Sequence, residues 1–410
     1  MERFTGLIGI ILILGIAFLF SNNKRRINLR LVFSGLGLQL VIAVLVLKVP
    51  VVNHFFQLLG KGMQKLESFA KEGASFVYGG LGVYDNSVQV INYRGAPAFV
   101  FGFNITATII LVCILVAILY HLHIMQFIVD KVARVMHFVM RVSGAEALSN
   151  AASAFVGQVE AQVMIRGYLP DMTPSELLAS MSGSLACIAG GILIVYVNMG
   201  ARPDYLIAAS LMAAPGALVI SKIVFPETEE SSTMGSAKLD VKSKYTNLLD
   251  AITHGAMDGF TIAMNVVALL IGFIALIAML NWMLGHIYHG LSLDFIFGKL
   301  FYPFAWAMGV PQQDIHSAAT LLGQKLTINE FIAFKSLTTQ SVPMVTNKGL
   351  TIITVAICGF ANFSSVGMQI GGIGALAPER RADLAKLGMR ALLCGTLASY
   401  LSATIAGMLV

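Results

Sequence analysis

Long apolar stretches separated by short polar segments recur along the chain. A helix of about 20 apolar residues crosses the ~30 Å hydrocarbon core of a bilayer. Stretches of about this length lie at residues 4–21, 29–48, 98–121, 174–199, 204–225, 259–284, 350–375 and 386–409. The pattern therefore predicts an all-α integral membrane protein with about eight transmembrane helices.

Two other segments are amphipathic. Residues 50–72 place Phe55 and Leu59 on one helical face and Lys61 on another, and residues 123–142 show the same kind of pattern. A helix with one apolar and one basic face lies in the membrane interface. We therefore expect two interfacial amphipathic helices.

Two apolar stretches fit neither a span nor an interfacial helix. They lie at residues 145–171 and 313–342, and each is interrupted near its middle, around Gly157 in the first and at residues 324–331 in the second. Non-helical backbone at membrane depth survives only where it lines a protected polar cavity. The sequence therefore predicts two re-entrant helical hairpins.

Each expected hairpin precedes a span with a polar, glycine-containing centre, at residues 182–191 and 359–365. A hairpin followed by an interrupted helix, occurring twice, is typical of transporters built from inverted repeats around a midplane site. We expect an inverted-repeat transport domain and a scaffold domain. The expected divisions are scaffold spans 1–3 with an interfacial helix 50–72 (1–122), an interfacial helix (123–142), the first half of the transport domain (143–225), a cytoplasmic loop (226–258), a sixth scaffold span with an interfacial helix (259–306), and the second half of the transport domain (307–410).

Composition excludes a soluble domain. Hydrophobic residues make up 57% of the 410 residues and charged residues only 12%, which would leave too apolar a surface in water. The net charge of +6 does not indicate nucleic acid, because the basic residues gather in short loops such as 24–26 and 380–381. That is the pattern of loops on the cytoplasmic side of a bilayer.

The basic loop at residues 24–30 predicts that the N-terminus lies outside the cytoplasm. An eight-span count then places residues 227–247 and 379–390 inside and the C-terminus outside. We interpret the acidic cluster from Glu227 to Glu230 as part of a solvated cytoplasmic loop. The first apolar run lacks a basic leader and a small-residue cleavage site, so we interpret it as a retained span. The expected location is an inner (plasma) membrane.

The polar residues do not indicate an enzyme. The four cysteines lie inside apolar runs without metal-ligand spacing, and we interpret them as packing residues. The sequence contains neither paired aspartate clusters nor a His-Glu-x-x-His motif. We therefore expect no catalytic residues and no cofactor.

Two acidic residues within the hairpins are the most informative positions. Glu160 and Glu330 each lie in a short apolar stretch interrupted near the acid. A carboxylate at membrane depth costs about 2.5–3.5 kcal/mol even on lenient scales, so such a residue indicates a functional site. We expect both carboxylates to be withdrawn from water and lipid and to face one solute chamber between the hairpins.

Four motifs occur in order along the chain: Gly157-Gln158-Val159-Glu160, Pro226-Glu227-Thr228-Glu229, Asn329-Glu330-Phe331 and Cys358-Gly359-Phe360-Ala361-Asn362-Phe363-Ser364-Ser365. Together they resemble the concentrative nucleoside transporter family over nearly the whole chain. The resemblance implies a homotrimer with a fixed scaffold and a mobile domain that holds both hairpins. It also implies import of nucleosides such as uridine by an elevator-like motion, driven by a sodium or proton gradient.

Carried over by position, the resemblance implies a substrate site with three groups of residues. The nucleobase falls at Gln158 and Glu160, the ribose at Glu330, Asn362 and Ser365, and the pocket lining at Ile192 and Phe360. Gly157 and Val159, in the same motif as Gln158 and Glu160, complete the substrate-binding set. The chemistry agrees, because an amide and a carboxylate match the donor and acceptor edge of a base. A carboxylate with Asn and Ser can bond ribose hydroxyls and so reject analogues that lack them.

The chain departs from the family pattern at several positions. Val159 stands where the family usually has Thr or Ser, and Gln162 and Gly167 replace residues that are commonly Pro. The family's sodium site corresponds to Ser153, Val156, Cys187 and Ile188. Replacing an amide oxygen with a hydroxyl and a hydroxyl with a thiol weakens a site for a hard cation. Sodium bound weakly and a proton carried by Glu160 therefore both stay open as the coupling ion.

Structural roles are the alternative for these residues. Glu160 and Glu330 would then pair with basic residues such as Arg166 or Lys325, and Asn362 would join helices. The alternative functions are transport of another small polar solute, a channel and an intramembrane enzyme. A channel requires a continuous polar face along several spans, whereas the polar residues here cluster at the two hairpins.

Overall fold

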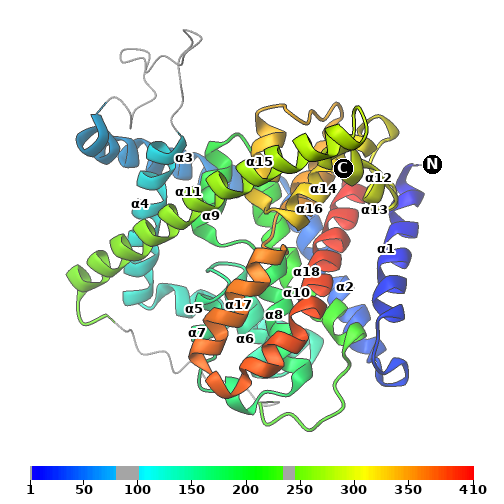
Figure 1. Cartoon of the computed structure of the whole chain (residues 1–410). Helices are drawn as coiled ribbons and strands as arrows, with labels where there is room; N and C mark the ends of the chain where they lie inside the picture. Colours follow the sequence, from blue (N-terminus) through cyan, green and yellow to red (C-terminus); the bar gives the residue numbers. More distant parts are fainter. Residues whose placement is uncertain (1, 80–100, 234–244) are drawn as a thin grey trace.

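The computed structural model describes residues 2–79, 101–233 and 245–410 (Figure 1). Every regular element within these ranges is a helix, which confirms the all-α prediction. Residues 98–100 of the third expected span and residues 234–244 of the expected cytoplasmic loop lie outside them.

The described part of each of the eight predicted apolar stretches is mainly helical. They form α1 (Glu2–Leu19), α2 (Leu29–Lys48), α4 (Phe101–His121), α8 (Pro174–Ala186) with α9 (Gly190–Asn198), α10 (Pro203–Val224), α11 (Leu248–Ile287), α16 (Asn347–Ile357) with α17 (Phe363–Leu376), and α18 (Arg381–Leu409). The hairpins are α6 (Gly144–Ser153) with α7 (Glu160–Val163), and α14 (Ile315–Thr327) with α15 (Glu330–Thr338). The remaining α-helices are α3 (Pro50–Tyr78), α5 (Ile124–Met140), α12 (Leu293–Leu300) and α13 (Tyr302–Ala307).

Three helices within the described ranges are individually long and apolar enough to cross a membrane, at Leu29–Lys48, Pro203–Val224 and Pro378–Leu409. Together, α4 and α5 also pass this test, but they meet at an angle of 75°. This bend fits a span followed by an interfacial helix. Two further expected spans are divided into half-helices, so neither half has the length of a full crossing.

The same order of elements occurs twice. A hairpin (α6 and α7) is followed by a broken helix (α8 and α9) and a long helix (α10), and the series recurs as α14 and α15, α16 and α17, and α18. The two long helices, α10 and α18, pack against each other. The two interrupted helices expected from the sequence are therefore present.

Asparagine side chains begin the half-helices that follow two of the interruptions. Asn329 Oδ1 accepts from the Ile332 amide at 2.9 Å at the start of α15. Asn362 Oδ1 accepts from the Ser365 amide at 2.8 Å at the start of α17. These caps satisfy N–H groups that lack an intrahelical partner. In the second hairpin, Glu330 is the first residue of α15 and directly follows the capping residue Asn329.

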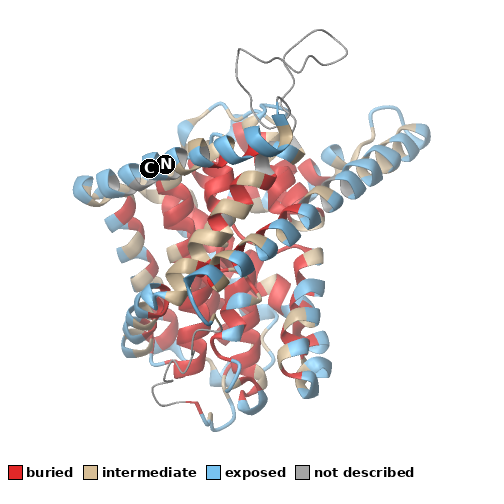
Figure 2. Ribbon diagram, turned by 90° about the vertical axis from the view of Figure 1, so that its left-hand side faces the viewer, coloured by how far each residue is buried: buried red, intermediate tan, exposed pale blue. Residues whose placement is uncertain are grey.

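The interior and the periphery differ sharply in exposure (Figure 2). The helices α8, α10 and α18 are buried along most of their length, whereas α11 is largely exposed. Its exposed residues include large apolar side chains such as Ile271 and Trp282. A contiguous apolar surface of this kind requires lipid or another protein chain. The N- and C-termini lie close together in both views (Figures 1 and 2).

Candidate functional site

A cavity of about 230 Å³ lies between helices α4 and α11 on one side and the first hairpin with α9 on the other. The α4 wall is largely apolar, whereas α11 contributes Asp258 and Ile262. Four residues expected at the substrate or sodium site line this cavity: Val156, Gly157, Glu160 and Ile192. The cavity therefore lies at the junction of the expected scaffold and the expected transport domain.

Glu160 lines this cavity and is exposed. A Cβ atom on Gly157 would lie 2.0 Å from Glu160 Oε2. The carboxylate thus folds back over the Gly157 backbone, and a side chain at that position would displace it. The expectation that Glu160 is withdrawn from water is wrong, because the hairpin turn ends directly at the cavity.

A second acid, Asp258, lines the same cavity and was missed by the sequence reasoning. The sequence suggested a loop over residues 226–258, but α11 begins at Leu248 and carries Asp258 well inside the helix. A lone carboxylate on a long apolar helix was the signal that could have identified it. The cavity therefore presents two carboxylates, one from each wall.

The phenol of Tyr245 also lines the cavity, just before α11 begins. Burial and the nearby Asp258 and Asp250 carboxylates raise the pKa of Tyr245. The group is therefore a neutral phenol at physiological pH and can donate a hydrogen bond to a solute.

Glu330 is buried in a separate polar cluster on the second hairpin. Its Oε1 accepts from the Tyr196 hydroxyl at 3.2 Å and its Oε2 accepts from Asn362 Nδ2 at 2.9 Å. Asn362 Oδ1 in turn accepts from the Ser364 hydroxyl at 2.7 Å. The structure therefore brings Glu330 and Asn362 together, as expected, and adds Tyr196, which the sequence reasoning missed.

A lysine partner for Glu330 was the structural alternative. Lys325 is fully buried, but its Nζ has no hydrogen-bond partner. The direct partners of the Glu330 carboxylate are instead the neutral groups of Tyr196 and Asn362. A contact ion pair therefore does not account for the burial of Glu330.

Two of the expected site residues retain buried polar atoms without a partner. Ser365 is 1% exposed and Gln158 is 8% exposed, and neither Ser365 Oγ nor Gln158 Oε1 has a hydrogen-bond partner. Gln158 Nε2 contacts the Met368 sulfur at 3.7 Å. Because a buried polar atom without a partner is costly, these atoms are suited to receive a polar ligand.

The remaining expected residues pack around the helix interruptions. Phe360 is half-buried in the interruption between α16 and α17, and its amide donates to the Cys187 carbonyl at 3.2 Å. Val159 packs against Gly372 of α17, where a Cβ would lie 2.6 Å from a Val159 methyl group. The tip of the first hairpin thus contacts the second half of the repeat.

Glu160 and Glu330 do not face one chamber in this structure. Glu330 is absent from the lining of the cavity that holds Glu160. The expectation of a shared chamber is wrong here, because Tyr196 and Asn362 enclose the Glu330 carboxylate. Tyr196 follows the cavity residue Ile192 by one turn of α9, so the Glu330 cluster lies about one helical turn from the cavity.

The expected sodium ligands offer few free oxygen atoms. The Ser153 hydroxyl donates to the Ser149 carbonyl at 2.8 Å and lies 2.9 Å from Ser184 Oγ. Cys187 presents sulfur, which points to the Ser210 carbonyl at 3.7 Å, and its own carbonyl accepts from Phe360. Val156 and Ile188 add only backbone oxygen. Because sodium requires oxygen ligands, these residues do not fit the ion.

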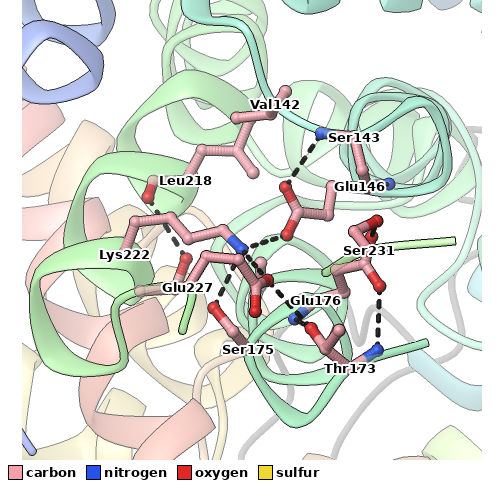
Figure 3. A network of polar contacts seen from close by, with 12 residues as sticks. Val142, Ser143, Glu146, Thr173, Ser175, Glu176, Leu218, Lys222, Glu227 and Ser231 are labelled. Atoms are coloured by element: carbon pink, nitrogen blue, oxygen red, sulfur yellow. Dashed lines mark hydrogen bonds and ion pairs between the residues drawn. The ribbon is translucent and has the colours of Figure 1, made fainter. Parts of the chain in front are cut away.

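A buried ion-pair network fixes the base of the first hairpin (Figure 3). Lys222 of α10 pairs with Glu146 of α6, donates to Ser175 Oγ of α8 at 2.8 Å and pairs with Glu227 at 3.2 Å. Glu227 also accepts from the Thr173 hydroxyl at 2.9 Å. The expectation of a solvated Glu227 is therefore wrong, because the segment after α10 folds back onto the hairpin.

Models of known protein families match three consecutive parts of the chain. The matches are described as "Na+ dependent nucleoside transporter N-terminus" over residues 8–81, "Nucleoside recognition" over residues 103–203, and "Na+ dependent nucleoside transporter C-terminus" over residues 205–407. Together they cover most of the chain in the order that the family requires.

Relatives with names that describe nucleoside transport match over nearly the whole chain. The chain is 36% identical to the nucleoside permease NupC of Helicobacter pylori, over 98% of this chain and 97% of the relative. It is also 36% identical to the sodium/nucleoside cotransporter 2 of Mus musculus, over 100% of this chain but 63% of that longer protein.

Solved structures match the fold closely. The chain superimposes on CNTnw in an inward-facing, substrate-bound state with a TM-score of 0.93 at 37% identity, covering 100% of this chain and 98% of the other. A CNTnw variant in an outward-facing state matches with a TM-score of 0.92, also at 37% identity, covering 100% and 98% of the two chains. The fold therefore resembles structures in two different transport states.

Proposed function

Because the chain belongs to the Na+-dependent nucleoside transporter family, we propose that it imports uridine-like nucleosides by cation-coupled symport. The family consists of transporters and not enzymes. The observation that carries the proposal is the cavity at the first hairpin, which is lined by Glu160 and Asp258 and lies between the first half of the repeat and the helices α4 and α11. We propose a bacterial plasma membrane as its location, with both termini outside the cytoplasm.

The nucleobase binds at the tip of the first hairpin in this proposal. Glu160 supplies a carboxylate at the cavity wall, and Gln158 supplies an amide oxygen that has no partner within the protein. The amide N–H group of Gln158 can donate, whereas its oxygen and the Glu160 carboxylate accept, and such a set matches the donor and acceptor edge of uracil. Ile192 lines the cavity and gives apolar contact to the ring, while Gly157 leaves room for the carboxylate and Val159 supports the turn.

The ribose binds at the second hairpin. Glu330 accepts from Asn362, and Ser365 Oγ has no partner, so hydroxyl groups of a sugar would complete this cluster. Removal of those hydroxyls leaves buried polar groups unpaired, which makes the site selective for ribose. Phe360, half-buried in the interruption between α16 and α17, borders the sugar in this proposal.

Alternating access follows an elevator-like motion of the hairpin domain against the scaffold. The cavity lies between α4 and α11 on one side and the first hairpin on the other, so a displacement of the hairpin changes its access. The exposed apolar face of α11 supports association of the scaffold into a homotrimer. The driving gradient is one of sodium or protons.

Uptake of labelled uridine into proteoliposomes tests the proposal. Sodium and pH gradients are imposed separately, and accumulation above the equilibrium level is expected with at least one of them. If nucleosides are the substrates, unlabelled nucleosides reduce the uptake of labelled uridine. If only other polar solutes reduce this uptake, the transporter carries one of those solutes instead. The absence of gradient-driven uptake of any nucleoside contradicts the proposal.

A further inference from the structure

A buried amide lies next to the residues expected to bind the coupling cation. Gln162 of α7 is 0% exposed. Its Nε2 donates to Ser184 Oγ of α8 at 2.7 Å and to Ser149 Oγ of α6 at 3.0 Å, and its Oε1 accepts from the Ser180 hydroxyl at 2.6 Å. One side chain thus joins the two arms of the first hairpin to the following half-helix.

The hydroxyl groups around Gln162 form a closed hydrogen-bond network. Ser153 donates to the Ser149 carbonyl, and Ser184 Oγ lies 2.9 Å from Ser153 Oγ; because the Ser153 hydrogen is already used, Ser184 is the donor of this pair. Ser180 donates to Gln162, and Ser149 Oγ lies 2.6 Å from Ser180 Oγ, so Ser149 is the donor of that pair for the same reason. Every hydroxyl hydrogen and both amide hydrogens therefore have an acceptor. The network is complete without an ion.

We infer that Gln162 replaces the coupling sodium ion: its amide group holds α6, α7 and α8 together and closes the site to sodium. The inference rests on the proposed nucleoside transport and specifies which ion that transport does not use. The chain then transports nucleosides without a requirement for sodium.

The electrostatics of the cluster support this inference. The Gln162 amide hydrogens carry partial positive charge and point at Ser184 Oγ and Ser149 Oγ, and Ser184 Oγ lies 2.9 Å from Ser153 Oγ, an expected sodium ligand. A sodium ion at Ser153 therefore lies one hydroxyl group away from these amide hydrogens and meets sulfur, not a hydroxyl oxygen, at Cys187. Because sodium binds oxygen in preference to sulfur, the surroundings of Ser153 and Cys187 do not favour the ion.

Two substitutions of Gln162 are expected to let sodium bind in the hydrogen-bond network of serines around this residue. Gln162→Glu keeps the shape of the side chain but replaces the N–H donors with a negatively charged acceptor. Gln162→Ala removes the side chain, frees the hydroxyl oxygens of Ser184 and Ser149, and leaves the Ser180 hydroxyl without its acceptor. Gln369→Ala is the matched control, because Gln369 is an equally buried amide whose Nε2 joins α17 to the Met181 carbonyl of α8 at 3.2 Å.

The experiment measures exchange of labelled uridine across proteoliposome membranes preloaded with unlabelled uridine, in sodium chloride or choline chloride at pH 8. Thermal unfolding of the purified protein is followed in the same two salts, because an ion that binds the native state raises the Tm. We expect wild type and Gln369→Ala to give equal exchange and equal Tm in both salts. At least one Gln162 variant gains severalfold faster exchange or a higher Tm in sodium.

Sodium-dependent exchange or a sodium-dependent Tm of the wild type overturns the inference. So does a pair of folded Gln162 variants that respond to sodium no more than Gln369→Ala does. Failure of the proposed function has a different signature, since wild type then exchanges no uridine in either salt. The Tm measurements still decide in that case whether Gln162 excludes sodium.

Discussion

The backbone amide of Phe360 donates a hydrogen bond to the carbonyl of Cys187 at 3.2 Å. Cys187 lies in the interruption between α8 and α9, and Phe360 lies in the interruption between α16 and α17. The bond therefore joins the broken helices of the two halves of the repeat at their centres. Backbone groups released by each interruption are satisfied in part by the other, which permits irregular backbone in a span.

The close contact between these two interruptions depends on Gly359, the residue before Phe360. Its φ is +141°, and a Cβ atom would lie 2.3 Å from the Ala186 carbonyl oxygen. Gly359→Ala is therefore expected to lower the free energy of unfolding by about 1–3 kcal/mol, measured by thermal unfolding in detergent. Gly367→Ala is the control, since a Cβ on this helical glycine meets nothing within 4 Å. Equal Tm values for the two variants would argue against a close contact between the two interruptions at Gly359.

Glu330→Gln is expected to weaken binding of uridine. An ionised acceptor becomes a mixed donor and acceptor, and hydrogen bonds to charged groups contribute about 1.5–3 kcal/mol, so the Kd rises roughly tenfold or more. Calorimetric titration with uridine and with 2′,3′-dideoxyuridine measures the effect, which is smaller for the analogue. Tyr196→Phe, which removes one donor to Glu330, is the control variant. A normal Kd in the Glu330→Gln protein shows that this carboxylate does not bind ribose.

Val159→Thr is expected to strengthen nucleoside binding. Threonine has nearly the same shape as valine, so the contact with Gly372 is retained while a hydroxyl is added beside Gln158 and Glu160. One hydrogen bond contributes about 0.5–1.5 kcal/mol, measured as a lower Kd for uridine. Val163→Thr introduces the same hydroxyl elsewhere on the cavity wall and serves as control. An unchanged Kd for Val159→Thr shows that the base does not reach this position.

Lys222→Met is expected to unfold or strongly destabilise the base of the first hairpin. The substitution leaves the buried Glu146 carboxylate without its cation, and removal of one partner of a buried pair costs about 3–5 kcal/mol. Thermal unfolding of the purified protein measures this loss. The double variant Lys222→Met with Glu146→Gln removes both charges and restores part of the stability. If the double variant is no more stable than the single one, the ion pair is not the cause.

The sequence by itself determined where most of the helices lie and where two of the spans are interrupted. Apolar length predicted the spans, and glycine with polar residues predicted the breaks that the structure places between α8 and α9 and between α16 and α17. The motif around Asn329 and Glu330 also gave its local structure, because an asparagine cap depends only on residues three positions away. These features were predictable because they depend on neighbouring residues.

Contacts between distant segments were decided only by the tertiary structure. The sequence suggested a solvated Glu227, a buried Glu160 and no role for Asp258, whereas folding pairs the first with Lys222 and brings the other two to one cavity. Likewise, the hydrogen bonds of Gln162 depend on serines from two other helices. Local periodicity specifies which face of a helix is apolar, but the exposure and partners of a polar side chain depend on which helices pack around it.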